Sequence, residues 1–170
     1  SNIQNIENEL NKKKDDQILM NFNDIDQDKL KIELSHNELI LHIVNKNLDL
    51  DSDEEQVLIV KLINDPNNPL KIVVIDFDPI LGKYFRSWEY LTSSTNQRAF
   101  NLEFEDLIGD FNLEIIFSGT NKNNATTFFA FKKTNSPSNL GVFFVPICQI
   151  VSDGTIKINK INRLPSYQIG

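Results

Sequence analysis

Hydrophobic and polar residues alternate with period two over much of this chain, which predicts short β-strands. The alternation is clear in residues 30–44, but its parity changes across the sequence SHNE at residues 35–38. Because neighbouring side chains of a strand point to opposite faces, the change predicts a turn or a bulge there. The apolar residues on the two sides are Leu30, Ile32 and Leu34, then Leu39, Leu41 and Ile43.

Further apolar segments have the length and the turn-rich flanks of strands. Residues 57–63 (VLIVKLI) are almost continuously apolar, which predicts a central, buried strand. Short strands separated by turn sequences predict a mainly β protein, a two-sheet antiparallel β-sandwich of about eight strands. The other predicted strands are residues 71–77, 99–104, 111–117, 127–133, 141–150 and 155–161.

Aromatic residues are concentrated in two of the late strands. Phe129 and Phe131 alternate with Ala130 on one strand, and Phe143 alternates with Val145 on the next. We expect these faces to meet in the interior of the sandwich.

Residues 79–91 are the one segment with helical spacing. Pro79 suits the first turn of a helix. The segment therefore predicts one short helix within the sandwich, whose apolar stripe consists of Ile80, Tyr84, Trp88 and Leu91.

The chain divides into three parts. Residues 1–28 are polar and lack alternation, which indicates a tether, with a short helix near its beginning as the alternative. Residues 29–164 form the predicted sandwich domain, and residues 165–170 are a C-terminal tail.

Composition removes several classes of function. The chain has 170 residues with 17 Lys and Arg against 24 Asp and Glu, a net charge of −7, so it lacks the basic surface that nucleic acid requires. The single cysteine, Cys148, stands in an apolar run and is expected to be a buried thiol. We therefore expect no nucleic-acid partner and no intramolecular disulfide.

The sequence DFD at residues 76–78 raises the question of catalysis, since Asp-x-Asp after an apolar strand is typical of haloacid-dehalogenase-type phosphatases. Such an enzyme needs alternating strands and helices, whereas the segments here alternate with period two. We therefore predict that the protein is not an enzyme. Asp76 and Asp78 are instead expected at a solvated strand end, with Asp78 capping the predicted helix.

An acidic segment lies between the first two predicted strands. Asp49, Asp51 and Asp53 are spaced as in an EF-hand loop, but Glu54 replaces the required glycine and Val60 replaces the last acidic ligand. His36 and His42 lie too far apart on an extended strand to share a metal. The segment is therefore predicted to be a solvated loop, and no cofactor or metal is expected.

The order of these elements resembles the TssJ family, the small outer-membrane lipoproteins of type VI secretion systems. The resemblance lies in residues 54–65, 78–91, 126–147 and 154–161, which are similar to a second strand, a short helical insertion, a late hairpin and a closing strand. It implies a transthyretin-like sandwich. It also implies a non-enzymatic adaptor at the periplasmic face of the outer membrane, held there only by an N-terminal lipid anchor that is not part of this chain.

The resemblance also implies a partner, the periplasmic domain of an inner-membrane secretion protein. In the TssJ family the loop between the first two strands makes that contact. The predicted partner-binding residues are therefore Asp49, Asp51, Asp53, Glu54 and Glu55. The alternative is a ligand-binding or carbohydrate-binding β-sandwich that uses its loops or an aromatic groove.

Overall fold

The computed structural model describes residues 29–153, which contain eight β-strands and no α-helix. The strands are β1 (Glu38–Lys46), β2 (Glu55–Leu62), β3 (Leu70–Asp78), β4 (Lys83–Leu91), β5 (Asn101–Glu105), β6 (Glu114–Thr120), β7 (Thr126–Thr134) and β8 (Phe143–Ser152). Within this part of the chain, no helix is long and apolar enough to cross a membrane.

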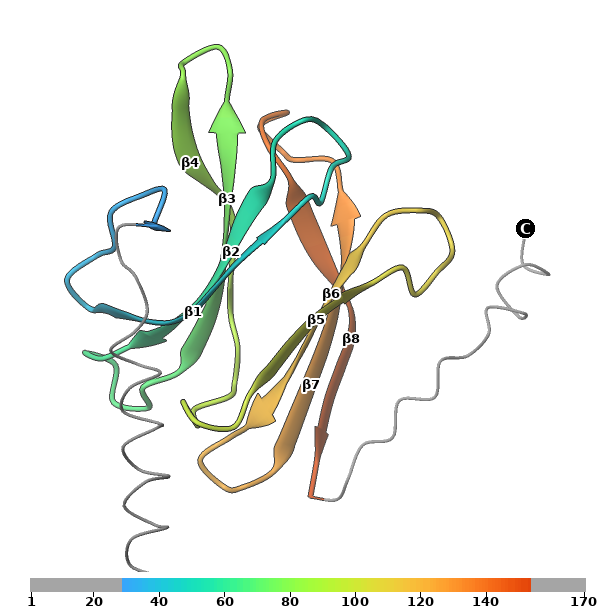
Figure 1. Cartoon of the computed structure of the whole chain (residues 1–170). Coiled ribbons are helices and arrows are strands. Elements are labelled where there is room, and N and C mark those ends of the chain that lie inside the picture. Colours follow the sequence, from blue (N-terminus) through green and yellow to red (C-terminus); the bar gives the residue numbers. More distant parts are fainter. Residues whose placement is uncertain (1–28, 154–170) are drawn as a thin grey trace, which may run out of the picture. The chain divides into compact units, whose positions relative to one another are not determined.

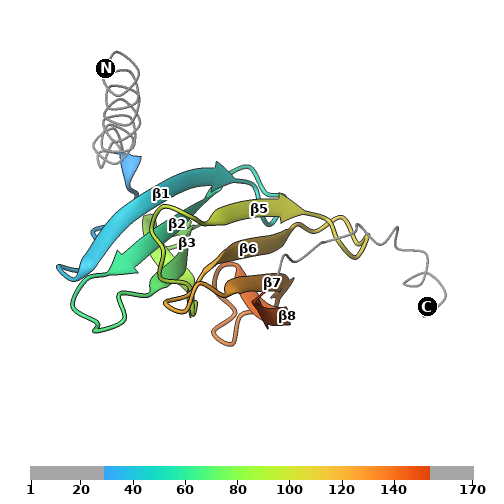
Figure 2. The same ribbon diagram turned by 90° about the horizontal axis from the view of Figure 1, so that it is seen from below.

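The strands form two four-stranded antiparallel sheets, in the orders β1-β2-β3-β4 and β5-β6-β7-β8. Each sheet is thus a run of consecutive hairpins, and the two sheets form two layers (Figures 1 and 2). The ring of His42 on β1 lies 6.3 Å from the ring of Phe100, just before β5. At the opposite side, β4 contacts β8. The predicted two-sheet antiparallel β-sandwich is confirmed.

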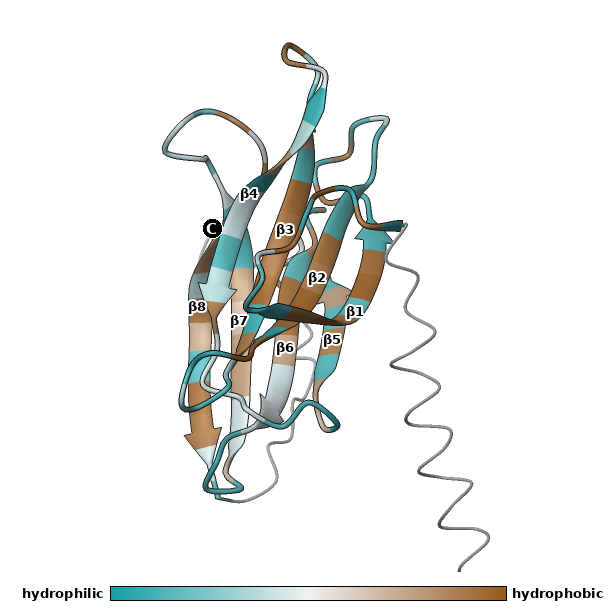
Figure 3. Cartoon of the chain, turned by 90° about the vertical axis from the view of Figure 1, so that its left-hand side faces the viewer, coloured by the Kyte–Doolittle hydropathy of each residue, from teal (hydrophilic) through white to brown (hydrophobic). Residues whose placement is uncertain are grey.

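The middle strands of the first sheet are buried on both faces. All residues from Glu55 to Val60 on β2 are buried, as are those from Ile72 to Asp76 on β3. Figure 3 shows the same strands as bands of hydrophobic residues. The prediction of a central buried strand at residues 57–63 is therefore confirmed, with β2 ending one residue earlier.

Aromatic side chains join the two sheets. The Trp88 ring on β4 lies 4.9 Å from that of Phe131 on β7 and 5.2 Å from that of Phe144 on β8. Tyr90, two residues further along β4, packs edge-on against Phe131 at 4.6 Å and Phe129 at 5.7 Å. Such ring pairs add stabilisation beyond the area they bury. The predicted interior position of Phe129 and Phe131 is confirmed.

The predicted helix over residues 79–91 is wrong. Residues 83–91 form β4, which pairs with β3 along its length. Gly82 adopts a left-handed conformation (φ +65°), and its N–H donates to the Asp78 carbonyl at 2.7 Å, which closes a tight turn. The helical spacing was misleading because Tyr, Phe and Trp also favour strands. Ile80, which the helix would have buried, is 87% exposed in the turn.

The change of parity at residues 35–38 is a turn, as predicted, in which the Glu38 N–H donates to the Ser35 carbonyl at 3.0 Å. The alternating residues before it do not form a strand, and β1 begins only at Glu38. The predicted strand at 155–161, the tether at 1–28 and the tail at 165–170 lie outside the described residues.

The predicted orientation of β8 near its start is also wrong. Phe144 is buried, whereas Val145 is 39% exposed and Phe143 is only half-buried. The pairing of β7 with β8 is irregular between Ala130, which pairs with Cys148, and Phe131, which pairs with Pro146. Because proline has no N–H to donate to a neighbouring strand, it favours such a bulge, which reverses the parity of the residues before it.

This parity can be tested by truncating the two neighbouring phenylalanines separately. We expect Phe144→Ala to lower the free energy of unfolding by about 3–5 kcal/mol, since it removes a buried ring that contacts Trp88. Phe143→Ala should cost clearly less, because that ring is half-buried. Urea unfolding of both variants measures the difference, and an equal or reversed order would contradict the orientation of β8.

Candidate functional site

Glu55 is the first residue of β2 and lies inside the protein at the end of the loop formed by residues 47–54. Only 1% of its surface is exposed. Its Oε2 accepts a hydrogen bond from the N–H of Leu48 at 2.5 Å, and the Leu48 side chain is itself buried. The other carboxylate oxygen, Oε1, is buried and has no hydrogen-bond partner. A buried acceptor without a partner costs free energy and requires an explanation.

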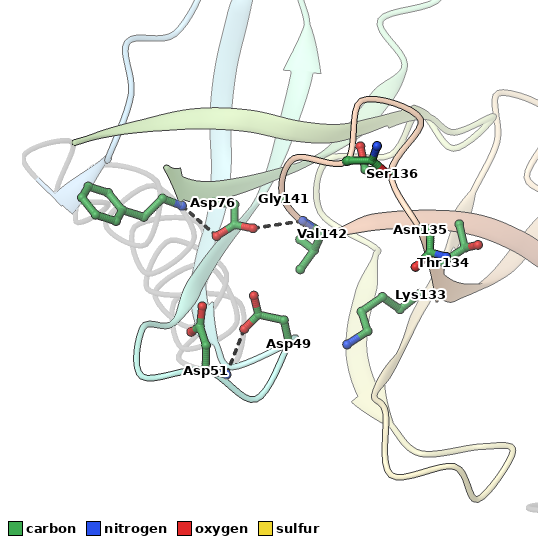
Figure 4. Close-up of a pocket in the computed structure, with 11 residues that line it drawn as sticks. Asp49, Asp51, Asp76, Lys133, Thr134, Asn135, Ser136, Gly141 and Val142 are labelled. Atoms are coloured by element: carbon green, nitrogen blue, oxygen red, sulfur yellow. Dashed lines mark hydrogen bonds between the residues drawn. The ribbon is translucent and has the colours of Figure 1, made fainter. Parts of the chain in front are cut away.

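Asp76 brings a second buried carboxylate to the same place from β3. It accepts the N–H of Phe77 at 2.7 Å and the N–H of Val142 at 3.0 Å (Figure 4). Val142 lies just before β8, so this bond connects the two sheets. The prediction that Asp76 is solvated is therefore wrong.

Gly141 makes this connection possible. Its φ is +70°, and a Cβ at this position would lie 2.6 Å from the Phe85 ring and 3.1 Å from Asp76 Oδ2. Only glycine allows the backbone to approach Asp76 so closely in this conformation.

A third carboxylate, that of half-buried Asp49, completes what we call the Glu55 cluster: Asp49, Glu55 and Asp76. One oxygen from each of the three lies within 4.8 Å of the others. Asp49 is held in place by the N–H of Asp51, which donates to its Oδ1 at 3.1 Å (Figure 4). The cluster therefore combines one residue of the loop with the first residue of β2 and one residue of β3.

The electrostatics of the cluster are unfavourable for three negative charges. Burial raises the pKa of Glu55 to about 7; the Leu48 N–H opposes this shift, and the nearby Asp49 and Asp76 add to it. The pKa of Asp49 is also raised, mainly by burial. Among the described residues, no Lys, Arg or His forms an ion pair with these three carboxylates.

Glu38 shows how the same protein stabilises another buried carboxylate. Arg86 and Lys71 lie 2.6 and 2.9 Å from its oxygens. The Arg86 hydrogen bond is the main reason why the pKa of Glu38 lies far below its usual value. In the Glu55 cluster the nearest comparable residue, Lys133, donates to the carbonyl oxygen of Leu48 at 3.2 Å instead.

A pocket of about 400 Å³ lies beside the cluster, and Asp49 and Asp76 are among the residues that line it. It is polar, and β7 and the segment leading to β8 form its other wall. The lining residues are Asp49, Asp51, Asp76, Phe77, Lys133, Thr134, Asn135, Ser136, Asn139, Gly141 and Val142.

The structure separates the five residues predicted to bind a partner into two groups. Asp51, Asp53 and Glu54 are exposed on the loop, where Asp51 also accepts the N–H of Asp53 at 2.7 Å. Asp49 and Glu55 belong to the interior cluster. The prediction that the whole segment is a solvated loop is therefore wrong for Glu55.

Asp76 was not predicted to join these residues, because only the register of β2 with β3 brings it to Glu55. Gln56 pairs with Ile75, and because the strands are antiparallel, Glu55 before Gln56 lies opposite Asp76 after Ile75. Asp78, predicted as a helix cap, instead accepts the N–H groups of Ile80 at 2.9 Å and Leu81 at 3.2 Å and so caps the β3–β4 turn. It is buried, so the prediction that Asp78 is solvated is also wrong.

The raised pKa of Glu55 predicts how stability depends on pH when divalent ions are removed with EDTA. The folded chain holds the Glu55 proton up to pH about 7, whereas the unfolded chain releases it near its usual 4.5. The contribution of Glu55 to stability should therefore fall as pH rises from 4.5 to about 7. Urea unfolding across this range measures the fall.

Two variants test whether Glu55 causes this pH dependence. Glu55→Gln should remove the part of the fall that Glu55 causes. The remaining pH dependence comes from Asp49 and Glu114, whose pKa values are also raised, and from His42, whose lowered pKa acts in the opposite direction. Glu54→Gln changes an exposed neighbour and should leave the profile as in the wild type. A Glu55→Gln profile with the same slope as the wild type would contradict the burial of an unpaired Glu55.

Comparison of the chain with models of protein families, with curated proteins and with solved structures finds no match. Its function is therefore argued from the side chains described above.

Proposed function

We propose that this protein is a non-enzymatic binding domain whose Glu55 cluster binds a calcium ion. The observation that carries the proposal is the Oε1 atom of Glu55, which is buried without any donor in a carboxylate that lies close to two others. A bound cation would supply the partner that no side chain supplies. It would also offset the repulsion between the three negative charges.

The spacing of the oxygens suits such an ion. Calcium binds oxygen ligands at about 2.3–2.6 Å, so two oxygens on the same ion are at most about 5 Å apart. The oxygens of Asp49, Glu55 and Asp76 lie within 4.8 Å of one another. Small rotations of the side chains would bring all three to one ion, and backbone carbonyls and water from the adjacent pocket would complete the coordination.

The ligand types favour calcium over zinc and magnesium. All three side chains are carboxylates, whereas structural zinc sites use Cys and His. Magnesium demands near-octahedral geometry and keeps several water molecules, while calcium accepts irregular sets of six to eight oxygens. A cluster that combines a loop residue with two strand residues provides such an irregular set.

A cation at this position would stabilise the end of the sandwich where the two sheets meet. Glu55 and Asp49 tie the loop to β2, and Asp76 already binds the Val142 N–H before β8. The role we infer is therefore structural: the ion fixes the loop and its exposed acidic residues in one conformation.

The calcium site can be tested by NMR on the isotope-labelled chain. Addition of calcium after treatment with EDTA should shift the amide signals of Leu48, Asp51 and Val142, since each N–H donates to a carboxylate of the cluster. Glu55→Gln should abolish these shifts, because it keeps the shape of the side chain and removes its charge.

The matched control is Glu54→Gln, which removes the same charge from the exposed neighbouring position. Its amide shifts should follow those of the wild type. If the three amides of the wild type do not move in millimolar calcium, the Glu55 cluster does not bind the ion.

A second candidate function is the adaptor function that the TssJ resemblance implies. Its supporting observation is that Asp51, Asp53 and Glu54 are exposed together on the loop between β1 and β2, without an ion pair to a described residue. Clustered exposed charge of one sign attracts a partner surface of the opposite sign. The partner would be a periplasmic domain of an inner-membrane secretion protein with exposed Lys and Arg, and this chain would face it from the outer membrane.

The adaptor function predicts that replacing Asp51, Asp53 and Glu54 by Ser slows association with that periplasmic domain and weakens its dependence on salt. Glu55 is left unchanged because it is buried. Circular dichroism and the melting temperature should stay close to wild type. Surface plasmon resonance at several salt concentrations measures the effect, and unchanged rates would show that this loop is not the contact.

A further inference from the structure

The loop before β6 resembles the loop before β2 at five of nine positions. Residues 47–55 read NLDLDSDEE and residues 106–114 read DLIGDFNLE. Both contain a side-chain amide or carboxylate at the first position, Leu at the second, Asp at the fifth, Asp or Asn at the seventh and Glu at the ninth. Each loop closes the first hairpin of its sheet, β1–β2 or β5–β6, and its Glu is the first residue of the following strand.

The hydrogen bonds of the two loops correspond as well. The second-position N–H of Leu48 or Leu107 donates to Oε2 of the ninth-position Glu, at 2.5 Å in each loop. The fourth-position N–H donates to the first side chain, at 2.7 Å in one loop and 2.8 Å in the other. The seventh-position N–H donates to the fifth-position Asp, at 2.7 and 3.0 Å.

The backbone agrees at the fourth position, which is left-handed in both loops. Leu50 has a φ of +66° and Gly109 a φ of +75°. Leucine rarely adopts this conformation, so its presence there shows that the hydrogen bonds of the loop impose the shape.

Glu114 is buried in the same way as Glu55. None of its surface is exposed, and its Oε1 has no hydrogen-bond partner. One oxygen each from Asp106, Asp110 and Glu114 lies within 4.8 Å of the others, and we call this set the Glu114 cluster. Burial raises the pKa of Glu114, and the charges of Asp110 and Asp106 raise it further.

The two clusters differ in their source of ligands. All three carboxylates of the Glu114 cluster come from the loop and the strand that it opens, whereas Asp76 comes from β3. Ile115 pairs with Phe131, so the residue of β7 that corresponds to Asp76 is Lys132. Lys132 forms no ion pair with the carboxylates of the cluster among residues 29–153. Asp106 is the third carboxylate of this cluster and occupies the position at which the first loop has Asn47.

We propose that the Glu114 cluster is a second calcium site, so that the chain binds two calcium ions, one at the opening hairpin of each sheet. The proposal rests on the unpaired Glu114 oxygen, on the three clustered carboxylates and on a loop geometry present twice. It does not depend on the Glu55 cluster, since no residue is shared between the two sites. Both loops lie at the same end of the sandwich, where Lys46 at the end of β1 packs over the Phe104 ring near the end of β5 (Figure 1).

The test is a titration of the whole chain with calcium chloride by isothermal calorimetry, after removal of metals with EDTA. We expect two calcium ions per chain for the wild type, one for Glu55→Gln, one for Glu114→Gln and none for the double variant. Glu103→Gln is the matched control, because it removes the same charge from an exposed position on β5 and should leave both ions bound.

Each pattern of results decides one of the two sites. One ion per wild-type chain that is lost only in Glu55→Gln overturns the second site and leaves the proposed function standing. One ion that is lost only in Glu114→Gln has the opposite meaning, and no binding to the wild type overturns both. A titration with magnesium chloride in place of calcium should give at least tenfold weaker binding at both sites, and equal affinity would contradict the assignment to calcium.

Glu114→Gln could fail to fold because it alters a buried residue, so the wild type provides a second measurement. Calcium should shift the amide signals of Leu107 and Gly109, whose N–H groups donate to Glu114 and Asp106. If these two amides stay in place while those of Leu48 and Val142 move, the Glu114 cluster binds no calcium.

Discussion

The contact between β4 and β7 sets the relation between the two sheets, and the candidate site depends on it. Trp88 and Tyr90 on one sheet pack against Phe129 and Phe131 on the other. Large aromatic rings fix both the distance and the angle between sheets because they interlock in few orientations. The segment that follows β7 is thereby brought to β3, where the Val142 N–H reaches Asp76. The packing of these apolar side chains thus brings polar residues of both sheets together at one end of the sandwich.

The buried carboxylates lower the stability that this packing provides. Removing an unpaired charge from water costs on the order of several kcal/mol, and a protein avoids the cost by pairing the charge or by keeping a proton on it. Glu38 is paired with Arg86 and Lys71, whereas Glu55 and Glu114 each have at least one N–H donor on one oxygen, no partner on the other and two acidic neighbours. The folded chain without an ion therefore favours a protonated Glu55 below pH about 7. A bound divalent cation would neutralise the carboxylates in place of that proton. The same three residues would therefore destabilise the fold without an ion and stabilise it with one.

The sequence predicted what depends on local pattern and missed what depends on pairing between distant segments. Period-two alternation located most strands, and the continuous run at residues 57–63 identified the buried strand β2. The predicted helix at residues 79–91 was wrong because the aromatic residues there fit a helical stripe and a strand equally well. A turn at Gly82 ends β3 and allows the following residues to form β4 instead. The predicted orientation of Phe143 was wrong because a bulge beside Pro146 skips one residue of β8 in its pairing with β7, and the alternation of residues did not locate that bulge. The position of Asp76 beside Glu55 follows from strand register, which no single segment encodes.

The correspondence between residues 47–55 and 106–114 is different, because it can be found in the sequence alone when the two loops are aligned on Glu55 and Glu114.

That correspondence also shows which residues specify the loop. The third, sixth and eighth positions differ, with Asp49 against Ile108, Ser52 against Phe111 and Glu54 against Leu113. The backbone also differs at the sixth position, where Phe111 has a φ of +67° and Ser52 has no positive φ. The acceptors that both loops share are the side chains at the first, fifth and ninth positions, which bind the N–H groups of the fourth, seventh and second positions. The remaining positions are free to differ between the two loops. In the first loop this freedom supplies Asp49, and with Asp76 the cluster spans two strands and connects the sheets. In the second loop the ligands stay within one hairpin, so an ion there stabilises that hairpin alone.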